Sequence, residues 1–277
     1  MNQNLEKQTG LPISLVNGKL SSKETLDGLT GKQPQIRTLE ELRPYLKNPQ
    51  VDSSLKNVYL IYRGVSFPND NGFISKKGLR YDLTVILAGR LGAEFPKTIG
   101  HYHETKPGTK LSYPEIYEVI SGKALFLFQR IENQNQAKEI YLIKAEPGEK
   151  VIVPPGFGHI TINIGLKPLI ISNVFANGVN SIYSFFKNHQ GAAYYILASD
   201  PKLSLSAVPY ENFAAEKNPA YKTVGKLERQ KPRKNLALKI NLKKPLYVSL
   251  MENPVSFEFL LNPENFEAEL TPRNLFD

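Results

Sequence analysis

Two of the four histidines lie two residues apart, in the segment GHYHE at positions 100–104. If this segment is a strand, His101 and His103 project from the same face, about 6.5–7 Å apart along the chain. Two imidazoles at that spacing can converge on one divalent ion. An isolated HxH pair is more often two unrelated surface residues than a metal site, so the interpretation depends on whether further donors accompany it.

Two further donors follow at short intervals. Glu115 stands in PEIYEVISG, directly ahead of a predicted strand, with six residues between it and Gly122. His159 lies in PGEKVIVPPGFGHITIN, and a hairpin of suitable length can return the chain to the same sheet. Nitrogen and carboxylate donors without sulfur suit Fe(II), Mn(II), Zn(II), Ni(II) or Co(II). The alternative for each residue is a hydrogen-bonded side chain in the core of a β-sandwich.

The composition excludes several classes of protein. The absence of cysteine rules out disulfide frameworks, zinc–thiolate sites and cysteine nucleophiles. No apolar run approaches the ~20 residues of a membrane helix, and the polar N-terminus lacks the apolar core of a secretory signal, so we expect a cytoplasmic protein without a membrane partner. The net charge of +9 is concentrated in residues 222–244, where no aromatics interleave the lysines, so no nucleic-acid partner is expected.

The elements that must position the donors are mostly strands. Short runs rich in Val, Ile, Tyr and Phe end on Gly, Pro, Asn or Asp, which predicts strands closely followed by turns. These runs cover residues 58–63, 81–89, 116–122, 124–131, 139–145, 150–156, 160–165 and 169–176. Many short strands without intervening helices indicate an all-β fold, an antiparallel sandwich or barrel.

The flanks are less regular. Residues 1–57 are predicted to form an N-terminal arm and a short helix at 38–49, packed on a barrel formed by residues 58–200. Residues 201–277 are expected to be a linker, centred on 214–234, and a partly helical C-terminal extension. The extension holds too few residues to bury a core of its own.

The two histidine segments resemble the two motifs of the cupin superfamily, which implies a jelly-roll β-barrel. The first motif matches with a lengthened loop at 104–114, and the second matches at each defined position. The flanking runs TIGHYH, PEIYEVISGKA, PPGFGHITINIG and NPAY are similar, more narrowly, to the cupin-type (archaeal-type) glucose-6-phosphate isomerase family. That likeness runs from about residue 10 to about residue 221.

The resemblance implies a metal-dependent aldose–ketose isomerase of glycolysis and gluconeogenesis, which interconverts glucose 6-phosphate and fructose 6-phosphate. It assigns the metal to His101, His103, Glu115 and His159, with Fe(II) or Mn(II) as our first choices, and gives Glu115 the catalytic role. The implied substrate-binding residues are Tyr59, Thr84, Thr98, Gly100, Tyr117 and Tyr183. Glu115 would move a proton either between C1 and C2 or, in a hydride shift, between the two oxygens.

Two positions depart from the family pattern, and both are expected beside the substrate. Ser181 stands where a histidine is usual, and Phe175 stands where a tyrosine hydroxyl is expected. Other functions therefore stay open: a cupin dioxygenase or decarboxylase, another sugar-phosphate isomerase, or a non-catalytic sugar-binding cupin. We also expect a homodimer, in which the arm segment LPISLV (11–16) adds a strand to the neighbour's sheet.

Overall fold

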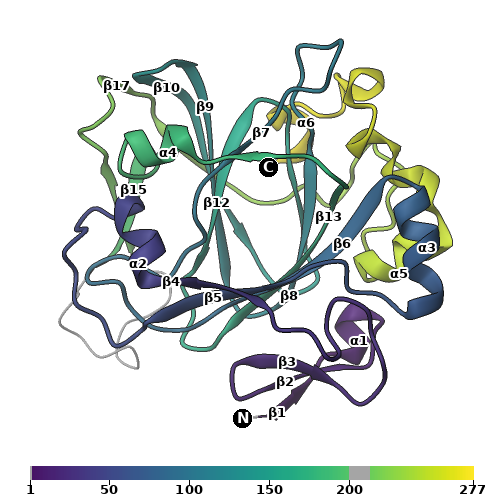
Figure 1. The fold of residues 1–277 in the computed structure, drawn as a ribbon. Helices are drawn as coiled ribbons and strands as arrows, with labels where there is room; N and C mark the ends of the chain where they lie inside the picture. Colours follow the sequence, from purple (N-terminus) through teal and green to yellow (C-terminus); the bar gives the residue numbers. More distant parts are fainter. Residues whose placement is uncertain (1, 200–212) are drawn as a thin grey trace.

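The computed structural model describes residues 2–199 and 213–277, and their centre is a pair of facing antiparallel sheets (Figure 1). The larger sheet has the order β11-β8-β13-β6-β5-β4. Its strands are β4 (Gln35–Thr38), β5 (Asn57–Tyr62), β6 (Leu79–Ile86), β8 (Glu115–Ser121), β11 (Lys150–Val153) and β13 (Leu169–Ala176). All eight predicted strand runs overlap a strand of the structure.

The second sheet has the order β12-β9-β10, with β17 and β18 added in parallel to β10. Its strands are β9 (Ala124–Asn133), β10 (Gln136–Ala145), β12 (Phe157–Asn163), β17 (Thr223–Val224) and β18 (Leu227–Gln230). The arrangement is that of a jelly roll, although within the described residues the two sheets are separate and do not close into one hydrogen-bonded barrel.

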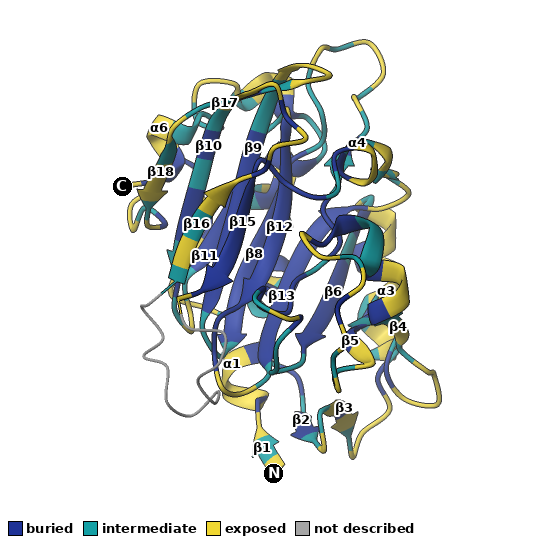
Figure 2. Cartoon of the chain, turned by 90° about the vertical axis from the view of Figure 1, so that its left-hand side faces the viewer, coloured by how far each residue is buried: buried dark blue, intermediate teal, exposed yellow. Residues whose placement is uncertain are grey.

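The strands at the centre of the two sheets are buried along most of their length (Figure 2). Every residue of β12 and β13 is buried, and the core is built from Val, Ile, Leu and Phe side chains. The polar residues on these strands, among them His159, Thr161 and Asn163, are buried as well. Along β8, Glu115 and Tyr117 face the interior, whereas Glu118 faces the opposite side.

Short strand pairs and helices surround this centre. The remaining strands are β1 (Asn2–Asn4), β2 (Ile13–Val16), β3 (Lys19–Ser22), β7 (Tyr102–His103), β14 (Ser181–Ile182), β15 (Tyr194–Ala198) and β16 (Phe213–Lys217). The helical elements are α1 (Glu6–Thr9), α2 (Leu39–Leu42), η1 (Arg43–Tyr45), α3 (Pro68–Lys76), α4 (Ser184–Asn188), α5 (Leu246–Glu252), η2 (Pro254–Leu260), η3 (Pro263–Phe266) and α6 (Pro272–Leu275). None of the described helices is long and apolar enough to cross a membrane.

The N-terminal arm differs from the expectation. Strand β2, which contains most of the LPISLV segment, pairs with β1 on one side and β3 on the other, so both its edges are used within its own chain. The idea that this segment adds a strand to a neighbour's sheet is therefore wrong. The predicted helix at 38–49 is shorter than expected: Thr38 forms a capping box with Glu41, and the helix tightens into η1 at Pro44.

The C-terminal extension is built into the fold. Residues 200–212 of the predicted linker lie outside the described residues, but 213–217 and 223–230 form strands rather than a linker, pairing with β15 and β10. Helix α5 packs beside β13, and the ring of Tyr247 lies 5.3 Å from that of Tyr81. The prediction of a partly helical extension is confirmed by α5, η2 and η3.

Candidate metal centre and cavity

Four potential ligands from three segments of the chain meet between the sheets. His103 ends β7, Glu115 begins β8, His159 lies within β12, and His101 joins β12 through a bridge in which the backbones of His101 and His159 exchange hydrogen bonds of 3.3 and 3.0 Å. One donor atom from each side chain lies within 4.8 Å of all the others. Donors on opposite sides of one ion are about 4.2 Å apart, so these side chains are close enough to share one.

The hydrogen bonds orient the imidazoles for coordination. Nδ1 of His103 lies 2.8 Å from the carbonyl oxygen of Tyr113, and Nδ1 of His101 lies 3.3 Å from that of Ile99. A proton on each Nδ1 leaves the Nε2 lone pair free, which is the usual arrangement for a ligand histidine. Nε2 of His103 is buried without a hydrogen-bond partner among the described residues.

The carboxylate sits between two of these rings. Oε2 of Glu115 lies 3.3 Å from Nε2 of His103 and 3.3 Å from Nε2 of His159. Burial opposes ionisation of Glu115, but the adjacent imidazoles outweigh it and hold the pKa of the carboxyl well below its usual range. Burial, together with the other two rings, lowers the pKa of His101 well below its usual value.

These observations fit a divalent cation. Imidazole nitrogens and a carboxylate oxygen converge here in a buried space, one of the nitrogens without a hydrogen-bond partner among the described residues, and a bound cation would accept all of these donors. The assignment of these four residues as metal ligands is a prediction.

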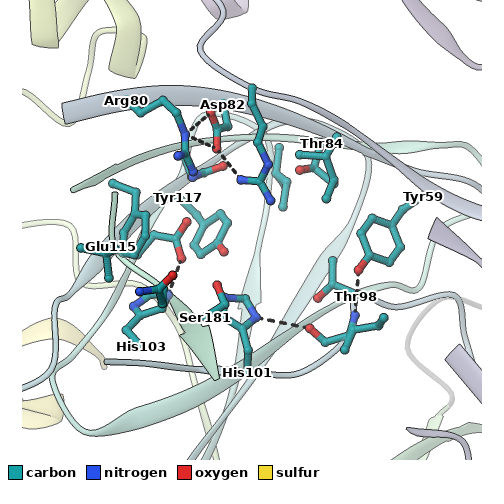
Figure 3. A pocket seen from close by; sticks show the side chains of 18 of the residues that line it. Tyr59, Arg80, Asp82, Thr84, Thr98, His101, His103, Glu115, Tyr117 and Ser181 are labelled. Atoms are coloured by element: carbon teal, nitrogen blue, oxygen red, sulfur yellow. Dashed lines mark hydrogen bonds and ion pairs between the residues drawn. The ribbon is translucent and has the colours of Figure 1, made fainter. Parts of the chain in front are cut away.

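A cavity of about 360 Å³ opens beside the cluster and is large enough for a small sugar phosphate (Figure 3). Five of the six expected substrate residues line it: Tyr59, Thr84, Thr98, Tyr117 and Tyr183. The hydroxyl of Tyr117 lies 3.1 Å from Nε2 of His159, and burial raises its pKa well above the usual value. The hydroxyl of Tyr59 accepts a hydrogen bond from the backbone N–H of Ile99, which leaves its own proton available to the cavity.

Gly100 is not among the residues that line the cavity. A Cβ at this position would lie 2.6 Å from Phe186 and 2.8 Å from Ile160, so the structure explains the glycine by close packing. The two departures from the family pattern do lie at the cavity: the ring of Phe175 is 4.4 Å from that of His103, and Ser181 pairs with His103 through β14.

His189 lies elsewhere. Its ring stacks between Phe185 and Tyr221 at 4.5 and 4.4 Å, and its Nδ1 donates to the carbonyl of Phe185. His189 does not line the cavity, so it does not take the place of the histidine that is usual at the position of Ser181.

Sequence reasoning missed three charged residues in the cavity wall: Arg63, Arg80 and Asp82. On β6, Arg80, Asp82 and Thr84 are two residues apart and share the inward face of the strand. Arg63 is the first residue after β5. The two-residue spacing of Arg80, Asp82 and Thr84 was the available signal, but such a spacing is also common on solvated strands.

The facing sheets and the buried cluster of three histidines and one glutamate define a jelly-roll protein of the cupin type with a candidate metal centre. The model of the glucose-6-phosphate isomerase family matches residues 38–206, which is more than half of the chain and includes all four cluster residues. The chain belongs to this family.

Individual proteins with similar sequences carry the same family name. The glucose-6-phosphate isomerase of Thermococcus gammatolerans is 27% identical over 160 residues, which is 57% of this chain and 78% of the relative. That of Thermococcus litoralis is 40% identical over 92 residues, covering 33% of this chain and 43% of the relative. That of Pyrococcus furiosus is 29% identical over 150 residues, covering 53% and 72%.

Solved structures with local similarity include an oxalate decarboxylase variant from Bacillus subtilis, with 21% identity, a TM-score of 0.32, and coverage of 45% of this chain and 28% of that one. Another is hazelnut vicilin, with 14% identity, a TM-score of 0.34, and coverage of 48% and 34%.

Proposed function

We propose that this chain is a metal-dependent aldose–ketose isomerase that interconverts glucose 6-phosphate and fructose 6-phosphate. The observation that carries the proposal is the cluster of His101, His103, Glu115 and His159, of which the first three line a sugar-sized cavity, within the region matched by the family model. We propose these four as the metal ligands, with Fe(II) or Mn(II) as the ion and Zn(II), Ni(II) or Co(II) as alternatives.

Isomerisation requires hydrogen to move between C1 and C2 while negative charge develops on the sugar oxygens. A divalent ion bound here would act as a Lewis acid and stabilise that charge. Glu115 is ionised at neutral pH, because the adjacent imidazoles lower its pKa. It therefore has no proton of its own to lose first, although the lowered pKa also makes it a weaker base. Its carboxylate is proposed as the group that moves protons, and such a group contributes about 10²–10⁴-fold to a rate.

The cavity wall supplies orientation. We assign the hydroxyls of Tyr59, Thr84 and Thr98 to the phosphate end and Tyr117 and Tyr183 to the sugar; a backbone contact from Gly100 stays a prediction. Thr98 Oγ1 accepts a hydrogen bond from the backbone of Thr161, so its own proton can point to a ligand. These contacts would hold the phosphate at a distance from the reacting carbons, and the binding energy of such a remote group can be converted into rate.

The proposal is tested by a coupled assay with fructose 6-phosphate. We expect glucose 6-phosphate to form, and we expect excess chelator to stop the reaction and added Fe(II) or Mn(II) to restore it. Binding of the sugar phosphate without turnover would support the non-catalytic alternative. Oxygen consumption with an organic acid, without isomerisation, would support a dioxygenase.

Deuterium at C2 of glucose 6-phosphate separates the two proton routes. If Glu115 transfers the C2 proton, label is lost to solvent during turnover. If hydride shifts directly between the carbons and Glu115 serves only the oxygens, label is retained at C1 of the product. Mass spectrometry of the product distinguishes the two.

Replacing Thr84 by valine should raise the KM for fructose 6-phosphate about ten- to a hundredfold, because the variant loses a hydrogen bond to a charged group. The value of kcat should change much less, since the contact is present in the ground state and the transition state alike. Steady-state kinetics measure both constants. An unchanged KM would remove Thr84 from the phosphate site.

The homodimer also stays a prediction, now without the strand exchange first expected. Light scattering at working concentration should report twice the mass of 31.2 kDa. A monomer under the same conditions would contradict it. Cytoplasmic localisation and the absence of a nucleic-acid partner likewise remain predictions.

A further inference from the structure

The cavity wall contains a charged group of residues that has no role in the metal cluster or among the hydroxyls: Arg63, Asp82 and Arg80. Figure 3 shows Arg80 and Asp82 side by side. Asp82 is almost fully buried, with 2% of its surface exposed. Its two oxygens accept from Nε of Arg80 at 2.9 and 3.0 Å, from Nη1 of Arg63 at 3.1 Å and from the backbone N–H of Gly64 at 2.9 Å. A buried carboxylate is thus fully satisfied, but by two cations.

Two guanidinium groups share one carboxylate, so one positive charge is in excess at this wall. Glu115 would not offset it, because the divalent ion proposed above for the cluster would neutralise the charge of this carboxylate. The excess charge faces the cavity and not the protein interior, since both arginines line the cavity. A positively charged wall on a sugar-sized cavity favours an anionic ligand over a neutral one.

The two arginines are not equivalent. Nε of Arg80 contacts both oxygens of Asp82, and its side chain is 24% exposed. Arg63 gives Asp82 only one N–H group, its side chain is 45% exposed, and its other contact, from Nε to Gln35, is long at 3.4 Å. Nη2 of Arg63 has no hydrogen bond within the described part of the chain. Arg80 also has an Nη2 without a hydrogen bond among the described residues, and its Nη1 makes only a long contact of 3.5 Å to Asn177. Arg63 is the more accessible of the two, because its side chain is 45% exposed against 24% for Arg80.

The strand register brings Arg63 to the side of the cavity where Thr84 lies. Ile61 of β5 pairs with Thr84 of β6, and Arg63 lies two residues beyond Ile61 on the same face, opposite Asp82. The hydroxyls of Tyr59, Thr84 and Thr98 can orient a phosphate, but they carry no charge. Arginine presents a planar set of donors that matches the oxygens of a phosphate.

We propose that Arg63 binds the phosphate group of the substrate and makes the site selective for phosphorylated over unphosphorylated sugars. Asp82 and Arg80 are positioning residues: Asp82 holds one edge of the Arg63 guanidinium, and Arg80 neutralises Asp82 so that the charge of Arg63 remains available. The inference rests on the proposed function only in taking the anion to be the phosphate of a sugar phosphate.

The test compares Arg63→Gln, Arg63→Lys and a control, Arg273→Gln, which removes the same charge from an exposed residue of α6. Arg63→Gln should raise the KM for fructose 6-phosphate about ten- to a hundredfold, with a smaller change in kcat, and should weaken competitive inhibition by inorganic phosphate equally. Arg63→Lys should restore part of the affinity, because it keeps the charge but loses the planar donors. Arg273→Gln should match the wild type.

Arg80→Gln tests the positioning role. It leaves Asp82 to pair with Arg63 alone, so the KM should rise in the same direction, and Arg80→Lys should recover most of the loss by restoring the charge balance. Equal KM values for Arg80→Gln and wild type would remove Arg80 and Asp82 from the proposal.

Calorimetry with inorganic phosphate on the purified protein requires no turnover. Phosphate binding that is lost in Arg63→Gln supports the anion site even if the wild type isomerises no sugar, in which case only the proposed function fails. Equal phosphate affinity in wild type and Arg63→Gln, or no phosphate binding by the wild type, overturns the assignment whether or not the isomerase assay succeeds.

Discussion

Replacing His159 by alanine should remove the metal and lower turnover by about a thousandfold or more. The imidazole of His159 is one of three in the cluster, and its loss leaves the ion with one ligand fewer and a cavity filled by water. A Lewis acid that stabilises developing charge contributes several kcal/mol, which corresponds to this loss of rate. Elemental analysis and the coupled assay measure the two effects together.

The fourth histidine provides a matched control. His189 is also buried and also contacts aromatic rings, but it lies outside the cluster and does not line the cavity. His189→Ala should keep its metal and most of its turnover, although it should lose stability. Full metal occupancy in His159→Ala, or equal metal loss in both variants, would contradict the assignment of His159 as a ligand.

Replacing Glu118 by alanine should destabilise the fold by about 3–5 kcal/mol, because it leaves a buried lysine without its partner. Nζ of Lys150 donates to Oε1 of Glu118 at 2.8 Å, and the two side chains are 4% exposed or less. The pair also anchors the C-terminal extension: Oε2 of Glu118 accepts from the backbone N–H of Leu246 at 2.7 Å, and Lys150 donates to the carbonyl of Leu242 at 3.1 Å.

Urea unfolding of three variants measures this effect. Glu118→Ala should show the full loss, while the double variant Glu118→Leu with Lys150→Met should lose far less, since it removes both charges and fills the space. Glu132→Ala is the control, because its ion pair with Lys138 is more than half exposed and should contribute less than about 1 kcal/mol. A loss below about 1 kcal/mol for Glu118→Ala would show that the extension is not anchored through this pair.

The same anchor relates the extension to the candidate site. Glu118 lies on β8 three residues after Glu115, on the opposite face of the strand. The C-terminal ring of Phe276 packs 5.8 Å from Phe128, whose ring lies 6.2 Å from that of His159. The extension therefore supports β8, which carries Glu115, and β9, the neighbour of the strand that carries His159, although it lies beyond the region matched by the family model.

The strands and the histidine cluster could be predicted because their signals are local. Runs of β-branched and aromatic residues between turns mark each strand, and the two-residue spacing of His101 and His103 places both on one face. Helix α3 was missed because PNDNGFISK contains a glycine and has few apolar residues to reveal a helical period. Strands β17 and β18 were missed because they are short and largely polar.

The charged wall could not be predicted, for a different reason. Arg63 and Asp82 meet because the register of β5 and β6 places them opposite each other, and register depends on contacts distant in sequence. Two arginines near strand ends are ordinarily solvated. Similarly, nothing in the composition of LPISLV distinguishes a strand that pairs within its own arm from one that pairs with a neighbour.

The central claim is that one divalent ion, held by three imidazoles and one carboxylate, is required for sugar-phosphate isomerisation. The most direct test removes the metal from the protein, restores Fe(II) or Mn(II) in steps, and measures kcat with fructose 6-phosphate against metal bound per chain. We predict that activity rises in proportion to occupancy and reaches its maximum at one ion per chain. Activity of the metal-free protein equal to that of the fully loaded protein would contradict the account.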